Sequence, residues 1–411
     1  MAVSTQELGR RLREAREASG MTQEQVSREL GLSRASVAQM ELGNRQVTSL
    51  ELDRLAYLYV RDIRQFLAET FEPQDALTVL LRANPDFARD GKVAEGLRRC
   101  IALGREISNL EALLGIERDA MAPAAYPTSV LKSKWEAIRQ GGRVALEERR
   151  RLNLGEAPLY DITEILDGQG IRIALVPLPN DVSGLTIHEP EIGIFVAVNG
   201  SHSILRQRFS FAHEYAHVLL DRETSESIIS RGDNRAELIE IRANSFAAVF
   251  LMPDEGIRRY VQALGKGKPS RSIADVFDET DVTRVQRRSK PRTQQIRIYD
   301  LVLIAHRFGV STIAALFRLQ NLGLLNKDQV DLLRDDMDRG LDKDATKLMG
   351  LEGEAGKPLQ LDFKHRFVGL AVDAYQRELI SKAKLKELTQ MVNVSSESVL
   401  RLIEHYKEDN V

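Results

Sequence analysis

The chain has 411 residues, 43% hydrophobic and 29% charged, which is too long for one compact core and predicts two or three domains. Its net charge of −2 at pH 7 gives no overall attraction to nucleic acid or membranes, so any DNA binding must come from a local basic face. A single cysteine, Cys100, excludes an internal disulfide framework, and with neither a signal-peptide core nor a membrane-length apolar stretch in the sequence we expect a cytoplasmic protein.

Residues 1–68 are expected to form a bundle of short helices that contains a helix-turn-helix. Thr22 caps a helix that ends at Gly31, and Ser33 caps the next helix, which runs to Gly43. Two helices joined by a short glycine-containing turn can present the second helix to the DNA major groove. A plain helical corner with solvated charges is the alternative interpretation.

Residues 21–45, MTQEQVSRELGLSRASVAQMELGNR, resemble the XRE, or lambda-repressor-like, family of DNA-binding proteins. The resemblance implies DNA contacts by six residues, the first three at phosphates and the last three at base edges: Gln23, Ser33, Asn44, Arg34, Ala35 and Gln39. Arginine can bind guanine and glutamine can bind adenine, so this helix carries side chains able to read a sequence. Because acidic residues nearly cancel the arginines of this domain, we expect modest affinity per copy and a homodimer on a two-fold symmetric operator of double-stranded DNA.

Residues 69–128 have apolar residues at helical spacing until Pro123 and Pro127 interrupt the pattern. The stretch contains no recognisable chemistry, so we predict a helical connector or a dimerisation element. The backbone around Ala124–Ala125–Tyr126, between the two prolines, is a predicted site of self-cleavage because little is expected to protect it.

The next predicted domain, 129–296, begins with a helical pattern over 130–152 and continues into β-branched runs at 171–176 and 194–198. The alternation of helical and strand patterns predicts an α+β core. An edge strand of such a core, placed beside a metal ion, could hold an extended peptide by backbone pairing, as an endopeptidase requires.

Two histidines and a carboxylate within this domain have the spacing of a zinc hydrolase. His213 and His217 are four residues apart, so a helix places both imidazoles on one face, where they can bind one divalent ion. Glu214 directly follows the first histidine and can act on a water bound to that ion. Two unrelated core histidines are the alternative.

A catalytic zinc ion usually has three protein ligands and one water, so a third ligand is required. A downstream helical pattern places Glu240 on its apolar side and Arg235 and Arg242 on the other side. Because a carboxylate on a buried face is costly unless it is paired or bound to metal, Glu240 is the predicted ligand. Glu237, one turn earlier, is the second candidate, and a solvated glutamate at the edge of the apolar stripe remains the alternative.

These segments resemble the ImmA/IrrE family of zinc-dependent metallopeptidases over about residues 128–320. The runs that carry the resemblance are VPLPNDVSGLTI, IFVAVN, RFSFAHEYAHVLLDR and EIRANSFAAVFLMP. The resemblance implies a zincin-like domain in which His213, His217 and Glu240 bind Zn2+ and Glu214 is the catalytic base.

The chain departs from the pattern of that family at two places. Tyr215–Ala216 stands where Leu or Ile followed by Gly is more common, and Arg242 stands where many members carry a further Glu. The first departure concerns local packing, and the second removes one competitor for the position of third ligand.

Residues 264–296 contain glycines, prolines and a basic run over 284–292, which predicts an exposed loop and a second site of self-cleavage. The basic run suits a solvated surface, with nucleic-acid contact as the alternative. Residues 297–411 are expected to be helical and to form a regulatory or partner-binding region. Within them, 304–319 and 388–403 repeat the turn pattern of the helix-turn-helix, a small residue, an apolar residue and an N-cap serine, but lack its outer Arg/Gln pair. We therefore predict helix–helix corners there, with DNA contact as the alternative.

The sequence therefore predicts a multidomain, mainly α-helical protein with an α+β core: a lambda-repressor-like domain, a zincin-like metallopeptidase domain and a helical C-terminal domain. The predicted function is a DNA-binding regulator that cleaves itself, or a protein substrate such as a partner repressor, in a stress or mobile-element response. The alternatives are a regulator, or a toxin-neutralising partner, whose metal site is structural or sensory. Glu214 favours the enzyme, because a structural site needs no base beside its ligand.

Overall fold

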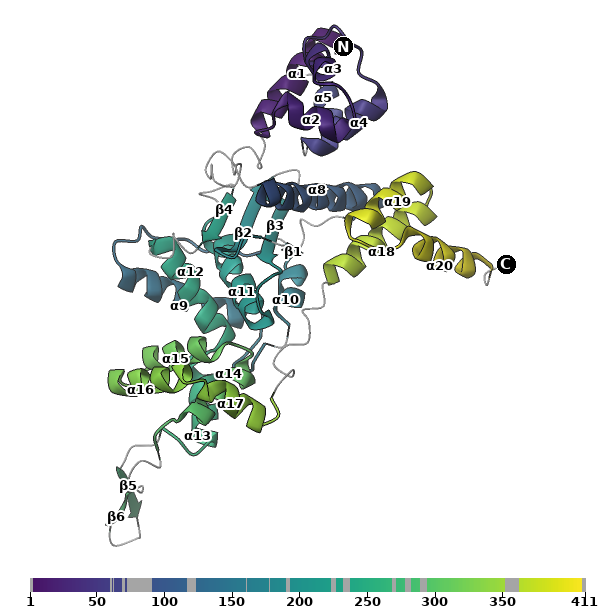
Figure 1. The fold of residues 1–411 in the computed structure, drawn as a ribbon. Coiled ribbons are helices and arrows are strands. Elements are labelled where there is room, and N and C mark those ends of the chain that lie inside the picture. Colours follow the sequence, from purple (N-terminus) through teal and green to yellow (C-terminus); the bar gives the residue numbers. More distant parts are fainter. Residues whose placement is uncertain are drawn as a thin grey trace.

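The computed structural model of the chain is mainly helical, with a four-stranded mixed sheet in its central part (Figure 1). It describes residues 3–59, 61, 63–68, 71, 91–116, 123–159, 161–176, 178–189, 193–222, 227–231, 237–267, 271–277, 282–288, 294–351 and 362–408. The prediction of a mainly helical protein with an α+β core is confirmed.

The N-terminal helices surround a core of their own. They are α1 (Thr5–Ala18), α2 (Gln23–Leu30), α3 (Arg34–Glu41), α4 (Ser49–Leu58) and α5 (Ile63–Leu67). Thr22 caps α2 in a capping box, and Gly31 ends this helix at a φ of 67°, a left-handed conformation that glycine adopts readily. Val26 of α2 and Val37 of α3 are buried in the same apolar cluster, so these helices form the predicted helix-turn-helix.

The central sheet has the strand order β1-β3-β2-β4. Its strands are β1 (Arg172–Val176), β2 (Val182–Glu189), β3 (Gly193–Asn199) and β4 (Ser227–Arg231). β1 is parallel to β3, whereas β2 is antiparallel to both β3 and β4. The strands predicted over 171–176 and 194–198 are confirmed as β1 and β3, whereas β2 and β4 carry weaker alternation and were not predicted.

One face of the sheet packs on four helices, one of which, α11 (Ile204–Leu220), carries both His213 and His217. The other three are α12 (Leu238–Leu251), α9 (Lys134–Arg151) and α10 (Ile162–Gly168). Ile173 of β1 and Val196 of β3 point into this core, as alternate residues of neighbouring strands do. α9 and α12 approach closely at Gly141, where a Cβ atom would clash with the backbone oxygen of Arg242.

Helix α8 (Gly91–Leu114) lies across the other face of the sheet (Figure 1). Its Ile101 packs in a cluster with apolar side chains of the sheet, and its Ile107 packs against the C-terminal helices. Those helices are α18 (Asp362–Gln376), α19 (Lys382–Met391) and α20 (Ser396–Glu408). The buried Arg172 of β1 donates to Glu111 of α8 at 2.8 Å. α8 therefore joins the sheet to the C-terminal helices by packing, although it precedes both of them in the chain.

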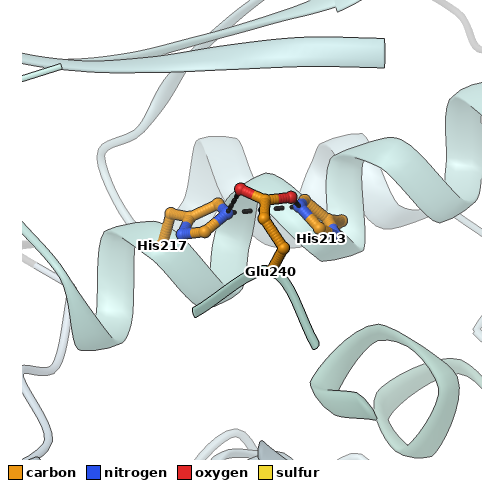
Figure 2. Close-up of side chains that lie close together, drawn as sticks. All are labelled: His213, His217 and Glu240. Carbon is orange, nitrogen blue, oxygen red and sulfur yellow. Dashed lines mark hydrogen bonds and ion pairs between the residues drawn. The ribbon is translucent and has the colours of Figure 1, made fainter. Parts of the chain in front are cut away.

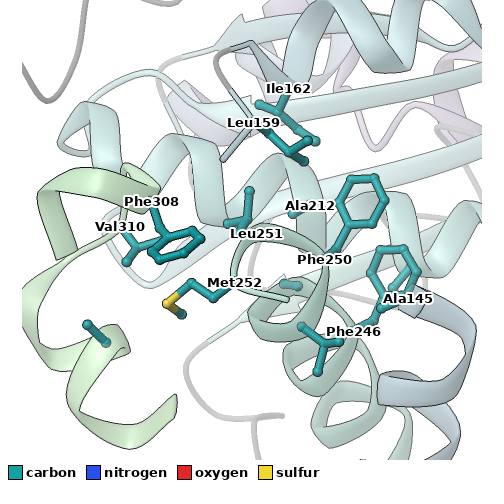
Figure 3. Packing of buried hydrophobic residues seen from close by; sticks show 14 of the residues in the cluster. Ala145, Leu159, Ile162, Ala212, Phe246, Phe250, Leu251, Met252, Phe308 and Val310 are labelled. Carbon is teal, nitrogen blue, oxygen red and sulfur yellow. The ribbon is translucent and has the colours of Figure 1, made fainter. Parts of the chain in front are cut away.

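A further group of helices extends the central core. These are α13 (Asp254–Ala263), α14 (Ile298–Phe308), α15 (Thr312–Asn321), α16 (Lys327–Asp338) and α17 (Leu341–Leu348). Phe308 and Val310, at the corner between α14 and α15, belong to the same apolar cluster as Phe250 and Met252 (Figure 3). The helix–helix corner predicted over 304–319 is thus confirmed, and it is packed against the core.

No single helix among the described residues has both the length and the apolar character of a membrane span. The pair α14 and α15 meets these criteria only when the two helices are taken together, and they are bent by 100° at the break between them.

The prediction of an exposed loop over 264–296 is wrong for the described residues that form two strands. β5 (Arg271–Phe277) and β6 (Val282–Arg288) pair as an antiparallel hairpin that projects from the part of the molecule carrying α13 (Figure 1). Glycines, prolines and a basic run made this stretch resemble a loop, but its sequence also contains the β-branched residues that strands favour, Ile273, Val276, Val282 and Val285.

Candidate metal centre

The helix α11 places two imidazoles side by side beneath the sheet. His213 and His217 occupy successive turns, are 5% and 0% exposed, and bring their Nε2 atoms to 3.2 Å from each other. Residues four apart on a helix share a face, so this convergence follows from the sequence spacing.

Glu240, in the first turn of α12, completes the cluster (Figure 2). Its Oε2 lies 3.2 Å from His213 Nε2 and its Oε1 lies 3.4 Å from His217 Nε2. Burial alone would raise the pKa of Glu240, but hydrogen bonds from both imidazoles lower it to about 2, so the carboxyl is ionised. Glu237, the second candidate, is the exposed N-cap of this helix and lies outside the cluster.

The spacing of the three donor atoms fits a tetrahedral metal ion. Ligands about 2.0–2.1 Å from a tetrahedral zinc lie roughly 3.3 Å from one another. The two Nε2 atoms are 3.2 Å apart, and each lies 3.2 or 3.4 Å from the nearer carboxylate oxygen of Glu240, a different oxygen for each histidine; all three side chains are buried. Two imidazoles and one carboxylate are also a donor set that suits zinc and other transition metals.

Each imidazole is oriented by a hydrogen bond at its other nitrogen. His213 Nδ1 is 3.0 Å from Asn244 Oδ1, and His217 Nδ1 is 2.8 Å from Asp221 Oδ2. Both partners are oxygen acceptors, so each Nδ1 carries a proton, and loss of the Nε2 proton that binds Glu240 would leave each Nε2 with a lone pair directed into the cluster. This tautomer is the one that metal binding requires.

Asp221 is itself held by Arg242, and here one prediction is wrong. The sequence analysis placed Arg242 on the polar side of its helix, yet the residue is 3% exposed and pairs with Asp221 Oδ1. Its Nη1 also donates to Gln140 Oε1 at 2.8 Å, and Gln140 Nε2 donates to Ser129 Oγ at 3.3 Å. A chain of hydrogen bonds therefore runs from His217 to the segment that precedes α9.

Glu214 lies between the cluster and the sheet and is completely buried. Its Oε2 accepts a hydrogen bond from Thr186 Oγ1 at 2.7 Å, whereas Oε1 has no hydrogen-bond partner among the described residues. A Cβ atom at Gly184 would lie only 2.7 Å from this Oε1, so glycine leaves the oxygen the space it occupies. Burial raises the pKa of the Glu214 carboxyl above its ordinary value.

The segment predicted to be open to self-cleavage before α9 is held against the core. Tyr126 donates from its backbone N–H to Leu219 O at 3.0 Å and from its hydroxyl to Glu148 Oε2 at 2.7 Å. Ala124 and Tyr126 also pack on the central cluster. The buried Glu148 accepts a further hydrogen bond from Tyr215, so the unusual tyrosine after Glu214 belongs to this same network.

The six residues predicted to contact DNA lie around the helix-turn-helix. Five of them are exposed: Ser33, Arg34, Ala35, Gln39 and Asn44. Ser33 caps α3, and Asn44 donates to Gln39 at 3.0 Å. Gln23 is half-buried, and its amide donates to Glu41 at 2.9 Å.

Sequence reasoning missed Asp221, Asn244 and Thr186. Asp221 follows His217 by four residues, so its place on the same helix face was available from the spacing. Asn244 follows Glu240 by the same interval on α12. Thr186 reaches Glu214 only because β2 lies over α11, and no local pattern indicates that contact.

Two segments of the chain match known protein families. Residues 167–279, which include the central sheet and the metal cluster, match the IrrE N-terminal-like domain of a peptidase family. Residues 7–63, which include α2 and α3, match a helix-turn-helix domain. A comparison of the chain with curated proteins gives no match. The chain therefore combines an N-terminal helix-turn-helix DNA-binding domain with a central IrrE N-terminal-like peptidase domain, as both resemblances implied.

Proposed function

We propose that the protein is a cytoplasmic, DNA-binding regulator whose central domain is a zinc-dependent endopeptidase. The observation that carries this proposal is the buried cluster of His213, His217 and Glu240 beside the carboxylate of Glu214. The described residues offer three metal ligands, which is the number typical of catalytic zinc, whereas structural zinc sites usually have four.

His213, His217 and Glu240 would hold the metal, which when bound lowers the pKa of a water and polarises a peptide carbonyl. Glu214 would take the proton of that water through Oε1 and pass it to the leaving amine. Thr186 supports this role, because its hydrogen bond to Oε2 fixes the carboxylate, while Oε1 has no hydrogen-bond partner in the part of the chain that the structure describes.

The regulator part of the proposal rests on α3. Arg34, Ala35 and Gln39 are exposed on this helix, where they would approach base edges while Gln23, Ser33 and Asn44 approach phosphates. We infer a homodimer on a two-fold symmetric operator, since that arrangement compensates for the modest affinity expected of one domain.

The enzymatic proposal is tested by mixing the zinc-loaded protein with candidate partner regulators and following their cleavage by mass spectrometry. The wild type should produce defined fragments, and Glu214→Gln should retain zinc but cleave at least about 10²-fold more slowly, since only the base is lost. Cleavage by Glu214→Gln at the wild-type rate would exclude this mechanism. Zinc binding with no cleavage of any partner by the wild type would favour a structural or sensory site.

A further inference from the structure

A cleft of about 920 Å³ extends from the metal cluster. It is bordered by α9, α12, the N-terminal half of α11 and α15, and both His213 and Glu240 lie in its wall. A polypeptide bound in this cleft would therefore pass directly beside the metal ligands. The volume lies near the upper end of the range typical of ligand pockets, roughly 300–1,000 Å³.

The wall of the cleft contains large apolar side chains that are poorly covered. Trp135 and Ile138 of α9 are 67% and 39% exposed, and Phe317 of α15 is 39% exposed. The two residues on α9 are three apart and face the cleft together. Several large apolar side chains that are exposed together next to a candidate catalytic centre are typical of a site that binds another molecule.

The charged side chains of the same wall are mostly cationic. Arg139 and Arg143 of α9 and Arg206 of α11 are all exposed, and Arg143 also pairs with the partly exposed Glu147 at 3.3 Å. The carboxylates that the described lining offers are committed elsewhere: Glu240 belongs to the metal cluster, and Asp254 pairs with Arg318. The cleft therefore complements a ligand that combines apolar groups with negative charge.

We propose that this cleft selects an extended segment that carries both apolar side chains and carboxylates on a second polypeptide chain. The inference rests on the proposed peptidase function and names the substrate class of that site. Peptide backbone offers no net charge, so the three arginines would act on the side chains of the substrate and thereby set its specificity.

The two self-cleavage segments predicted in this chain are both positioned away from the cleft. Tyr126 is bound at the C-terminal end of α11 through Leu219, whereas the cleft adjoins the N-terminal half of that helix. The hairpin of β5 and β6 projects outward beyond α13, and none of its described residues lines the cleft (Figure 1). A separate chain is therefore the occupant that the structure favours.

Trp135 provides a direct reporter, because it lines the cleft and is the single tryptophan of the chain. We would titrate zinc-loaded Glu214→Gln protein with a pair of apolar peptides that differ only in carrying Glu and Asp or their amides, and follow the fluorescence of Trp135. The acidic peptide should bind about five- to tenfold more tightly, as expected for two or three exposed ion pairs. The difference should shrink as salt is raised, because exposed charges are screened.

Matched variants on one helix locate the effect. Arg139→Glu combined with Arg143→Glu should abolish or reverse the preference for the acidic peptide. Arg150→Glu makes a single reversal of the same kind at an exposed position of α9 that does not line the cleft, and it should preserve the preference. Circular dichroism checks that each variant folds, and the comparison of the two peptides in the unmodified cleft does not depend on these variants.

Equal binding of the acidic and amide peptides, or the absence of any response of Trp135 to either, would overturn the inference. So would an Arg150→Glu effect as large as that of the double variant. Cleavage by the wild type without acidic preference would refute the substrate class and leave the peptidase function standing. Selective binding of the acidic peptide without cleavage by the wild type would support the ligand class of the cleft and count against the peptidase function.

Discussion

The imidazole of His217 is oriented by a carboxylate that is itself paired with a buried arginine. Burial alone would raise the pKa of Asp221, but hydrogen bonding to His217 and the charge of Arg242 lower it, so the group is ionised. An ionised acceptor strengthens the hydrogen bond from Nδ1 and increases the basicity of the metal-directed Nε2. The departure of Arg242 from the family pattern thus has a physical role in this chain.

We predict that Asp221→Asn weakens zinc binding by about 10- to 100-fold, because the partner of His217 becomes neutral while keeping its shape. The measurement is a competition titration of the protein against a chromophoric zinc chelator. Glu237→Gln serves as the control, since Glu237 is exposed and outside the cluster, and it should bind zinc as the wild type does. Unchanged affinity in Asp221→Asn would show that this hydrogen bond has no influence on the metal.

At the level of single residues, the sequence predicted those features that depend on spacing along one helix. His213 and His217 converge as expected, and Glu240 joins them because its helix packs on α11. Arg242 was misplaced because a helical pattern treats every arginine as outward-facing. Its burial depends on Asp221 and Gln140, which come from two other helical segments and are unknown before the fold is known.

The close packing of α9 on α12 depends on Gly141. Because Glu240 is part of α12, this packing also helps to position Glu240. We predict that Gly141→Ala lowers the free energy of unfolding by at least about 1–3 kcal/mol, because the added methyl group meets the backbone of Arg242, which cannot move aside alone. Chemical denaturation measures the change. Gly142→Ala is the control: its Cβ would lie 3.5 Å from Val249 Cγ2, an ordinary contact, and alanine favours helix by up to about 1 kcal/mol. Equal destabilisation by both substitutions would contradict this view of the helix contact.

The buried Glu148 joins α9 to α11 and to the segment before α9. Burial alone would raise the pKa of Glu148, but hydrogen bonds from Arg151, Tyr215 and Tyr126 outweigh it and lower the pKa below its ordinary value. A carboxyl with a lowered pKa in the folded state stabilises the protein above its unfolded pKa of about 4.3, and this contribution is lost as the pH falls below that value.

We therefore expect Glu148→Gln to lower the free energy of unfolding at pH 7 by about 2–4 kcal/mol, since it removes one partner of a buried charged network. The loss should diminish when unfolding is measured at successively lower pH, because the wild-type carboxyl also becomes neutral there. Glu147→Gln, a change in a more exposed pair with Arg143, should have an effect below about 1 kcal/mol. A Glu148→Gln effect that is independent of pH would show that the charge is not what stabilises the network.

Among the elements, the helices with caps were predicted well and the strands only in part. Thr22, Gly31 and Ser33 mark helix ends through their own hydrogen bonds and dihedral angles, which are local properties. β2 is recognised only by its pairing with β3 and β4, and the hairpin of β5 and β6 lies in a stretch whose composition resembles a loop. Pairing between distant segments is not visible in local patterns.

In the molecule as a whole, the described clusters divide the residues after 296 between two cores. α14, α15 and α16 pack with the central domain, whereas α18, α19 and α20 pack with α8. The domain boundaries at 68, 128 and 296 remain predictions. The helical C-terminal region consists of two groups of helices, and α8 lies between the sheet and the second group.

For the DNA-binding part we predict a salt-sensitive footprint of two half-sites about one helical turn apart. Arg34→Ala and Gln39→Ala should each reduce the free energy of operator binding by about 1–3 kcal/mol and relax the preference for the contacted base pair. Binding to operators changed at single positions measures both effects. Arg13→Ala on α1, also exposed, should preserve the sequence preference. Protection that persists unchanged after both α3 substitutions would remove α3 as the reading helix.

The central claim is that three protein side chains hold one zinc ion and leave a position for water beside Glu214. Anomalous scattering at the zinc edge from crystals of the zinc-loaded protein tests this claim most directly. We predict a single peak per chain, within about 2.0–2.2 Å of His213 Nε2, His217 Nε2 and a Glu240 oxygen, with no fourth protein ligand. A peak elsewhere, a fourth side chain on the ion, or no peak at this cluster would contradict the account.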